Sequence, residues 1–405
     1  MKIRFNRLAL GLALAGFGSL AHAAGFALIE QNASGLGNAY AGQAASAQDA
    51  STIFFNPAGM TELTGTELVI AGHLIQPSAR FSGTFSTPVG GGQGGDAGDL
   101  SFIPNAYAAF SLTENMRFGV GINAPFGLAT EYDADWVGRF QAVESSLKTI
   151  NINPSIAWKV SDQLSLGVGV NIQHINVVLS NGLSPLIPGS FGTVKGDDYG
   201  WGVNLGMLWK PSSVTRIGLA YRSEVDYTLE GTFASNTAAV PSGDVTAEAT
   251  MPASASLSLA QKLGSSLELL ADVTWTGWSA FDELRVLRSN GALLTLTPEN
   301  WENNLRYSVG LTWNMNSAWS LRTGVAYDET PVDDAFRTAR IPDESRTWLA
   351  LGGQYRMDSS NVIDFGYAHL FIEDASINHT TAAGTLNGEY SGNVDILSAQ
   401  FTHRF

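Results

Sequence analysis

Residues 149–160 read TININPSIAWKV, a segment in which apolar and polar side chains alternate. Successive side chains of an extended chain point to opposite faces, so this segment has one apolar face and one face of asparagine, serine and lysine. A period of two over about ten residues indicates a β-strand whose two faces meet different surroundings. The apolar positions are Ile150, Ile152, Ile156, Trp158 and Val160.

The same alternation recurs from residue 67 to the end of the chain, for example in residues 164–173, 201–209 and 305–314. Polar connections of two lengths separate these segments. Six short turns lie near residues 114, 162, 212, 265, 316 and 359, and they alternate with seven long connections. Thirteen connections predict fourteen strands, with both ends of the sheet on the short-turn side. The long connections are residues 86–99, 129–146, 180–198, 231–245, 280–300, 330–345 and 374–392.

The composition favours a membrane barrel. The chain is 44% hydrophobic and 15% charged. Past residue 23 it has no apolar run of about 18 residues, which a membrane-spanning helix needs. Outer-membrane barrels have short periplasmic turns, long outer loops and aromatic girdles. We therefore predict an all-β fold, a transmembrane antiparallel β-barrel of about 14 strands formed by residues 65–405. Aromatic residues precede the short turns at Phe110, Trp158, Trp209, Trp313 and Tyr355.

The end of the chain supports this prediction over a soluble propeller or solenoid, which would bury both sheet faces more continuously. Residues 394–405 read VDILSAQFTHRF and alternate up to the final phenylalanine. A terminal strand that closes on an aromatic residue resembles the signal that the barrel assembly machinery of the outer membrane reads. Phe405 is therefore the candidate assembly signal.

The first 23 residues have the order of a secretory signal peptide. Lys2, Arg4 and Arg7 precede an apolar stretch, and the sequence AHA at residues 21–23 predicts cleavage after Ala23. A single membrane anchor, the alternative, is disfavoured because the apolar stretch is short. Cleavage would leave 19 basic residues against 37 acidic ones, a net charge of −18. This charge disfavours nucleic acid and anionic membrane surfaces as partners.

Residues 24–64 differ from the rest of the chain. They contain no lysine or arginine, are rich in small and amide side chains, and show no strand alternation. Small residues pack closely, so we predict a compact plug, or hatch, inside the barrel lumen. A flexible periplasmic tail is the alternative, but Ile53, Phe54 and Phe55 favour a buried position.

Several of these segments resemble the FadL-type family of outer-membrane transporters for long-chain fatty acids and other hydrophobic compounds, which includes the TodX-like hydrocarbon transporters. The resemblance begins at Gly25-Phe26 and is strongest in residues 34–60, which include Asn56-Pro57-Ala58. It spans nearly the whole chain after residue 23. Further segments that resemble the family are GLATEY (127–132), YRSEV (221–225), RTGVAYD (322–328) and IPDE (341–344).

The resemblance implies passive diffusion of a ligand from the outer loops into an apolar pocket, and lateral exit beside a kinked third strand. It also implies that the hatch is the gate, with candidate gate residues Phe26, Asn56, Pro57 and Ala58. The third strand here reads MRFGVGINAPFGLATEY (116–132). Proline cannot donate to the ladder of a strand. The candidate lateral opening is Ala124, Pro125, Phe126 and Gly127; the alternative is a loop that starts at Asn123.

The sequence leaves the ligand class open. Fatty-acid-binding relatives place basic side chains in the pocket, but residues 171–181 (NIQHINVVLSN) and 294–304 contain none. A neutral hydrocarbon, aromatic or ester-like ligand is therefore as plausible as a fatty acid. Candidate polar contacts in the lumen are His174, Arg222 and Arg306.

Other function classes find little support. The histidines form no HExxH pair, and no G-x-S-x-G segment is present, so we expect no enzyme, cofactor or metal site. A general diffusion porin or a surface receptor remains the alternative to an uptake channel. We expect a monomer in the outer membrane of a Gram-negative bacterium. Its expected partners are the hydrophobic ligand, outer-membrane lipid, lipopolysaccharide and the assembly machinery, with no nucleic acid.

Overall fold

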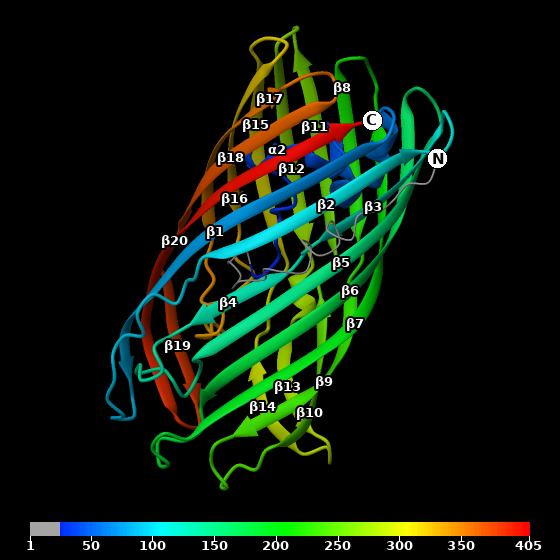
Figure 1. Cartoon of the computed structure of the whole chain (residues 1–405). Helices are drawn as coiled ribbons and strands as arrows, with labels where there is room; N and C mark the ends of the chain where they lie inside the picture. The colour runs from blue at the N-terminus through cyan, green and yellow to red at the C-terminus, as the bar shows by residue number, and fades with distance from the viewer. Residues whose placement is uncertain (1–24) are drawn as a thin grey trace.

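A computed structural model describes residues 25–405 as one closed antiparallel β-barrel (Figure 1). Twenty strand segments of this part of the chain pair into fourteen wall strands, because six wall strands are interrupted. The first strand, β1 (Glu67–Phe85), pairs along its whole length with the last, β20 (Gly384–Arg404), and so closes the barrel. The predicted all-β barrel of 14 strands is confirmed. The predicted signal peptide lies outside the described residues.

The strands between β1 and β20 follow the order of the chain. The strands are β2 (Ser101–Ser111), β3 (Met116–Asn123), β4 (Gly127–Glu131), β5 (Glu144–Lys159), β6 (Leu164–Gly182), β7 (Phe191–Trp209), β8 (Thr215–Arg222), β9 (Val225–Ser235), β10 (Gly243–Met251), β11 (Ser254–Leu263), β12 (Leu267–Thr276), β13 (Glu283–Arg288), β14 (Leu293–Pro298), β15 (Asn304–Asn314), β16 (Trp319–Asp328), β17 (Arg346–Arg356), β18 (Asn361–Ile372) and β19 (Ala375–Thr381). The interrupted wall strands are β3–β4, β8–β9, β10–β11, β12–β13, β14–β15 and β18–β19.

The wall strands alternate between exposed and buried side chains. In β16 every second residue from Trp319 to Tyr327 is exposed, and its neighbours point into the barrel. The exposed side chains along the wall are largely apolar or aromatic, as the lipid-facing surface of a barrel requires. The predicted girdle residues Trp158, Trp209 and Trp313 are all exposed near the short turns. Within residues 25–405, no helix is both long enough and apolar enough to span a membrane.

Two connections predicted as long loops are β-structure instead. Residues 280–300 contain the hairpin of β13 and β14, which follows the short 3-10 helix η2 (Trp278–Ala280), and residues 374–392 contain β19 and the start of β20. The prediction was wrong because these strands continue past the apolar part of the wall. There both faces can be polar, so the alternation that identifies a strand is weak.

The segment before β1 fills the lumen. It forms four short helices, α2 (Ala33–Leu36), α3 (Gln43–Ser46), α4 (Thr52–Phe55) and η1 (Pro57–Glu62). These helices contact wall strands on several sides of the barrel, including β5, β8, β11 and β18, and most of their residues are buried. A hatch therefore occupies the lumen, in agreement with the predicted fold.

Glycines on the inner wall allow the hatch backbone to approach closely. A Cβ atom at Gly324 would collide with the backbone of Asn38, and one at Gly218 would collide with the carbonyl of Ala44. Only glycine avoids these collisions. The inner wall is thus shaped to receive the hatch.

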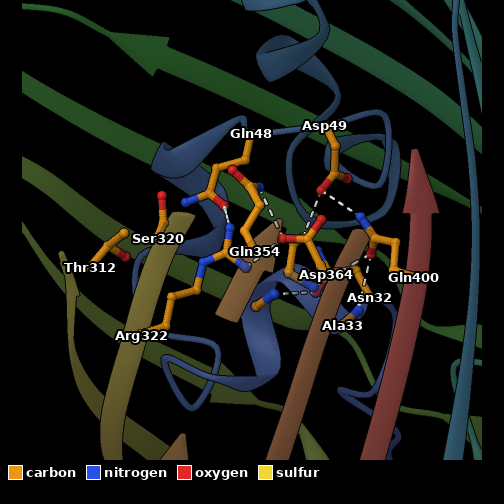
Figure 2. A network of polar contacts seen from close by, with 12 residues as sticks. Asn32, Ala33, Gln48, Asp49, Thr312, Ser320, Arg322, Gln354, Asp364 and Gln400 are labelled. Atoms are coloured by element: carbon orange, nitrogen blue, oxygen red, sulfur yellow. Dashed lines mark hydrogen bonds and ion pairs between the residues drawn. The ribbon is translucent and has the colours of Figure 1, made fainter. Parts of the chain in front are cut away.

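Buried polar contacts anchor the hatch to the wall (Figure 2). Arg322 of β16 pairs with Asp364 of β18 at 2.6 Å, and its Nη2 donates to Gln48 of the hatch at 3.0 Å. Gln400 of β20 donates to Asp49 of the hatch at 2.9 Å. The side chains of Arg322 and Asp364 are 2% and 1% exposed, so loss of either partner would leave an uncompensated buried charge.

Candidate functional site

The wall is interrupted at Pro125. β3 ends at Asn123 and β4 begins at Gly127. Both segments pair with β5, but of the two only β3 pairs with β2, along Ala106 to Ser111 of β2. Residues 101–105 of β2 therefore have no strand partner on the side of β4. The structure thus has an open ladder at the position where the sequence predicted a kink.

The hatch covers this open edge. Ala27 forms an antiparallel bridge with Phe126. The backbone N–H of Gly127 donates to the carbonyl of Phe26 at 2.9 Å, and that of Leu28 donates to the carbonyl of Pro125 at 2.8 Å. The start of the hatch therefore satisfies backbone groups that a neighbouring wall strand would satisfy in an intact ladder.

Contacts with β2 and Ala124 hold the same part of the hatch in place. The amide of Asn105 donates to the carbonyl of Glu30 at 2.9 Å, and the hydroxyl of Tyr107 donates to the carbonyl of Gln31 at 3.0 Å. The Gln31 side chain donates to the carbonyl of Ala124 at 2.9 Å. Residues 26–31 thus connect the two edges of the break.

Phe26 itself lies in an aromatic cage. Its ring centroid is 4.6 Å from that of Trp278, 5.5 Å from Phe281, 5.6 Å from Trp301 and 6.2 Å from Phe126. All five side chains are buried. Trp278, Phe281 and Trp301 were not predicted as site residues, because Phe281 lies within the predicted polar connection 280–300 and the two tryptophans flank it. The concentration of aromatic residues there was the available signal.

Two buried carboxyl groups near the start of the hatch were also missed. Asp343, in the connection between β16 and β17, accepts a hydrogen bond from the backbone N–H of Gly25 at 3.2 Å and one from Thr330 at 2.6 Å. Burial raises the pKa of Asp343 to about 6, against the effect of Arg346. Burial likewise raises the pKa of Glu30 to about 7. Asp343 belongs to the IPDE segment, so the resemblance offered a signal for it.

Asn56, Pro57 and Ala58 contact other parts of the hatch and the wall strands β6 and β7. The Asn56 amide donates to the carbonyls of Ala44 at 2.6 Å and Met207 of β7 at 2.9 Å. Asn56, a candidate gate residue, therefore bonds the hatch and β7 and not the backbone of the broken third strand. The Asn-Pro turn instead caps η1, since Asn56 accepts from the N–H of Ala58 at 3.0 Å, and it packs against β6 and β7.

A cavity of about 140 Å³ lies between the hatch and the wall, next to the break. Pro125 and Phe126 line it, together with Ala27, Leu28 and Ile29 of the hatch. An apolar cavity of about 150 Å³ can hold a benzene-sized molecule. A long acyl chain therefore requires more room than this arrangement offers.

Arg222 and Arg306 both line the cavity. Arg222 donates to the carbonyl of Phe54 at 3.0 Å and to the side chain of Asn171, and its guanidinium lies 4.3 Å from the centre of the Phe54 ring. Arg306 donates to the carbonyl of Ala39 at 2.8 Å. The structure thus brings these two predicted lumen residues to one cavity.

His174 does not belong to this group, and the prediction that it faces the lumen is wrong. Its neighbour Gln173 is buried on the inner face of β6, so the alternation of the strand turns His174 outward. There its ring lies 4.6 Å from that of the exposed Tyr199, and Nε2 lies 3.3 Å from Asp197.

Phe405, which follows the last residue of β20, is 77% exposed at the short-turn end.

The plugged barrel and its side break can be compared with known proteins. The sequence model of the outer membrane protein transport protein family (OMPP1/FadL/TodX) matches residues 14–405. The chain belongs to this family. The members of the family are transport channels and not enzymes. This chain is an outer-membrane β-barrel protein.

Relatives and solved structures agree with this placement. The chain is 30% identical to the 47 kDa outer membrane protein of Pasteurella multocida, over 91% of this chain and 92% of the relative. It is 27% identical to the long-chain fatty acid transport protein of Escherichia coli K12, over 100% and 99%. A Pseudomonas aeruginosa FadL homologue is 27% identical with a TM-score of 0.89, over 94% and 100%. The Pseudomonas putida toluene transporter TodX is 17% identical with a TM-score of 0.70, over 88% and 94%, and shares the fold.

Proposed function

We propose that this protein is an uptake channel for long-chain fatty acids or hydrocarbons. The ligand diffuses passively from the outer loops into the cavity beside the hatch and leaves sideways through the wall at residues 124–127. One observation carries the proposal: residues 26–28 of the hatch cap the open edge of the broken strand. The names of the similar proteins, a fatty acid transporter and a toluene transporter, support the ligand class.

The physical reason for a side exit is the cost of hydrating an apolar ligand. A straight path through the lumen ends in periplasmic water, where each Å² of apolar surface loses roughly 25 cal/mol. A ligand of a few hundred Å² would lose several kcal/mol there. A path through the wall delivers it to lipid instead.

The hatch couples binding to opening. Ala27, Leu28 and Ile29 line the cavity. Ala27 also pairs with Phe126 at the break, and Leu28 donates to the carbonyl of Pro125. A ligand larger than the cavity displaces these residues, and their displacement releases Pro125 and Gly127. Filling the site therefore opens the wall next to it.

A disulfide lock tests this route. The chain has no cysteine, so Ala27→Cys with Phe126→Cys would join the directly paired residues across the break. Uptake of radiolabelled oleate or toluene into cells should fall severalfold when the pair is oxidised and recover with reductant. The control pair, Val325→Cys with Leu349→Cys, joins two wall strands on their exposed face, away from the hatch. Equal uptake by the oxidised and reduced Ala27–Phe126 pair would reject the lateral route.

A general diffusion porin needs an open lumen. Here the hatch fills it, so we expect little steady ion current through a planar bilayer.

Contacts with lipopolysaccharide and with the assembly machinery, and a monomeric state, stay predictions for this protein.

A further inference from the structure

One wall of the lumen cavity carries hydroxyl side chains. Ser254 and Ser256 of β11 and Thr274 and Thr276 of β12 line it, with Arg306 on the next strand. Ser256 is paired directly with Thr274, and Thr274 with Arg306. Much of the remaining lining is apolar, from the hatch and the wall break. The cavity is therefore amphipathic and not uniformly apolar.

The hydrogen bonds of this wall have a fixed direction. The Thr274 hydroxyl donates to the carboxylate of Asp272 at 2.7 Å, and this uses its only hydrogen. Ser256 Oγ lies 2.7 Å from Thr274 Oγ1 and must therefore donate to it. Ser256 Oγ, at the end of this chain of bonds, can only accept from a ligand.

Arg306 offers the complementary chemistry. Its Nη2 donates to the carbonyl of Ala39, and Nε lies 3.9 Å from Asp328. Nε and Nη1 have no hydrogen-bond partner among the described residues, although the residue is only 6% exposed. Unpaired N–H groups on a buried guanidinium favour an anionic acceptor such as a carboxylate.

We propose, on the basis of the proposed transport function, that the ligand is a long-chain acid with a hydroxyl near mid-chain. The carboxylate binds Arg306, the hydroxyl donates to Ser256, and the rest of the chain takes the space from which it displaces hatch residues 27–29. Two strand spacings of about 4.8 Å separate the backbones of these residues, so the two ligand groups lie on the order of 10 Å apart. A bare hydrocarbon pairs with neither group, and an acid hydroxylated next to its carboxyl group does not reach both.

Binding of three matched acids to the purified barrel in detergent tests this specificity. The acids are octadecanoic acid, the same acid with a mid-chain hydroxyl, and its methoxy ether, which keeps the oxygen but cannot donate. Calorimetry should show the hydroxy acid binding about threefold to tenfold more tightly than the other two, the gain expected of one net hydrogen bond.

Two serine variants locate the effect. Ser256→Ala should abolish the preference for the hydroxy acid over octadecanoic acid. Ser155→Ala, an inner-wall serine of β5 that does not line the cavity, should retain the preference. Equal binding of the three acids, or a preference that survives in Ser256→Ala, would overturn the specificity while leaving the transport proposal intact. A folded barrel that binds none of the acids in detergent, and whose cells take up neither oleate nor toluene, would overturn both.

Discussion

The backbone N–H of Gly127 donates to the carbonyl of Phe26 at 2.9 Å, so the hatch accepts a hydrogen bond that a neighbouring wall strand would accept in an intact sheet. The bond joins two segments about 100 residues apart in the sequence. It also places the aromatic cage of Phe26 directly behind the break. Because the hatch supplies the acceptor of this bond, the wall stays closed at this point only while the hatch keeps its position in the lumen.

Closing the break with a continuous strand should block exit without blocking binding. Pro125→Thr supplies the missing backbone N–H and Gly127→Val favours extended backbone, so the double variant should narrow the opening. We expect uptake of oleate or toluene to fall severalfold while heat modifiability and ligand binding in detergent persist. Normal uptake by a correctly folded double variant would contradict the lateral exit.

Filling an inner-wall glycine should unseat the hatch. At Gly324 a valine side chain would collide with the backbone of Asn38, so Gly324→Val should raise ion conductance in a planar bilayer while the barrel still folds. Gly243→Val is the matched control, because a Cβ there meets nothing within 4 Å. A Gly324→Val barrel that folds and conducts no more than the Gly243→Val control would show that the hatch does not gate the lumen.

Seating of the hatch should depend on pH through Glu30. In the closed state burial raises its pKa from 4.5 to about 7, so the closed state binds the proton more tightly than a solvated open state. The contribution of Glu30 to closure is therefore complete below about pH 4.5 and is lost as the pH rises through 7. Cysteine labelling of an Ala27→Cys variant should become faster between pH 5 and pH 8 when its rate is divided by that of an exposed Gly243→Cys reference, which removes the general rise in thiolate with pH. Adding Glu30→Gln should flatten this profile, and a profile unchanged by that substitution would assign the pH dependence to another group.

Deletion of Phe405 should impair assembly more than stability. Its side chain is 77% exposed, and its backbone N–H donates to the carbonyl of Thr66 at 2.9 Å next to the start of β1. Little packing is lost when the ring is removed, so a shortened chain refolded in detergent should resemble the full-length barrel. In cells, we expect the amount of heat-modifiable barrel in the outer membrane to fall. Unchanged amounts would remove Phe405 as the assembly signal.

The barrel architecture could be predicted from local sequence patterns. Alternation in segments such as 149–160 and 305–314 identifies wall strands because lipid and lumen impose opposite polarity on the two faces. Pro125 marked the interruption of the third strand because proline lacks the backbone donor that a ladder needs. Both signals are local, so they can be read without knowing which strands are neighbours. His174 was placed on the wrong face although the same alternation, counted from Gln173, turns it outward.

The contacts between the hatch and the wall could not be predicted from the sequence. Residues 26–28 cap the break and Asn56 bonds β7, and both contacts depend on how the hatch lies in the lumen. The hatch sequence shows no alternation, so it does not predict this position. The direction of the hydrogen bond from Ser256 depends on Thr274 and Asp272 on the neighbouring strand. The Phe26 cage and the Asp343–Gly25 contact likewise join segments hundreds of residues apart. Such contacts arise from packing and register between distant strands, and no period in the sequence encodes them.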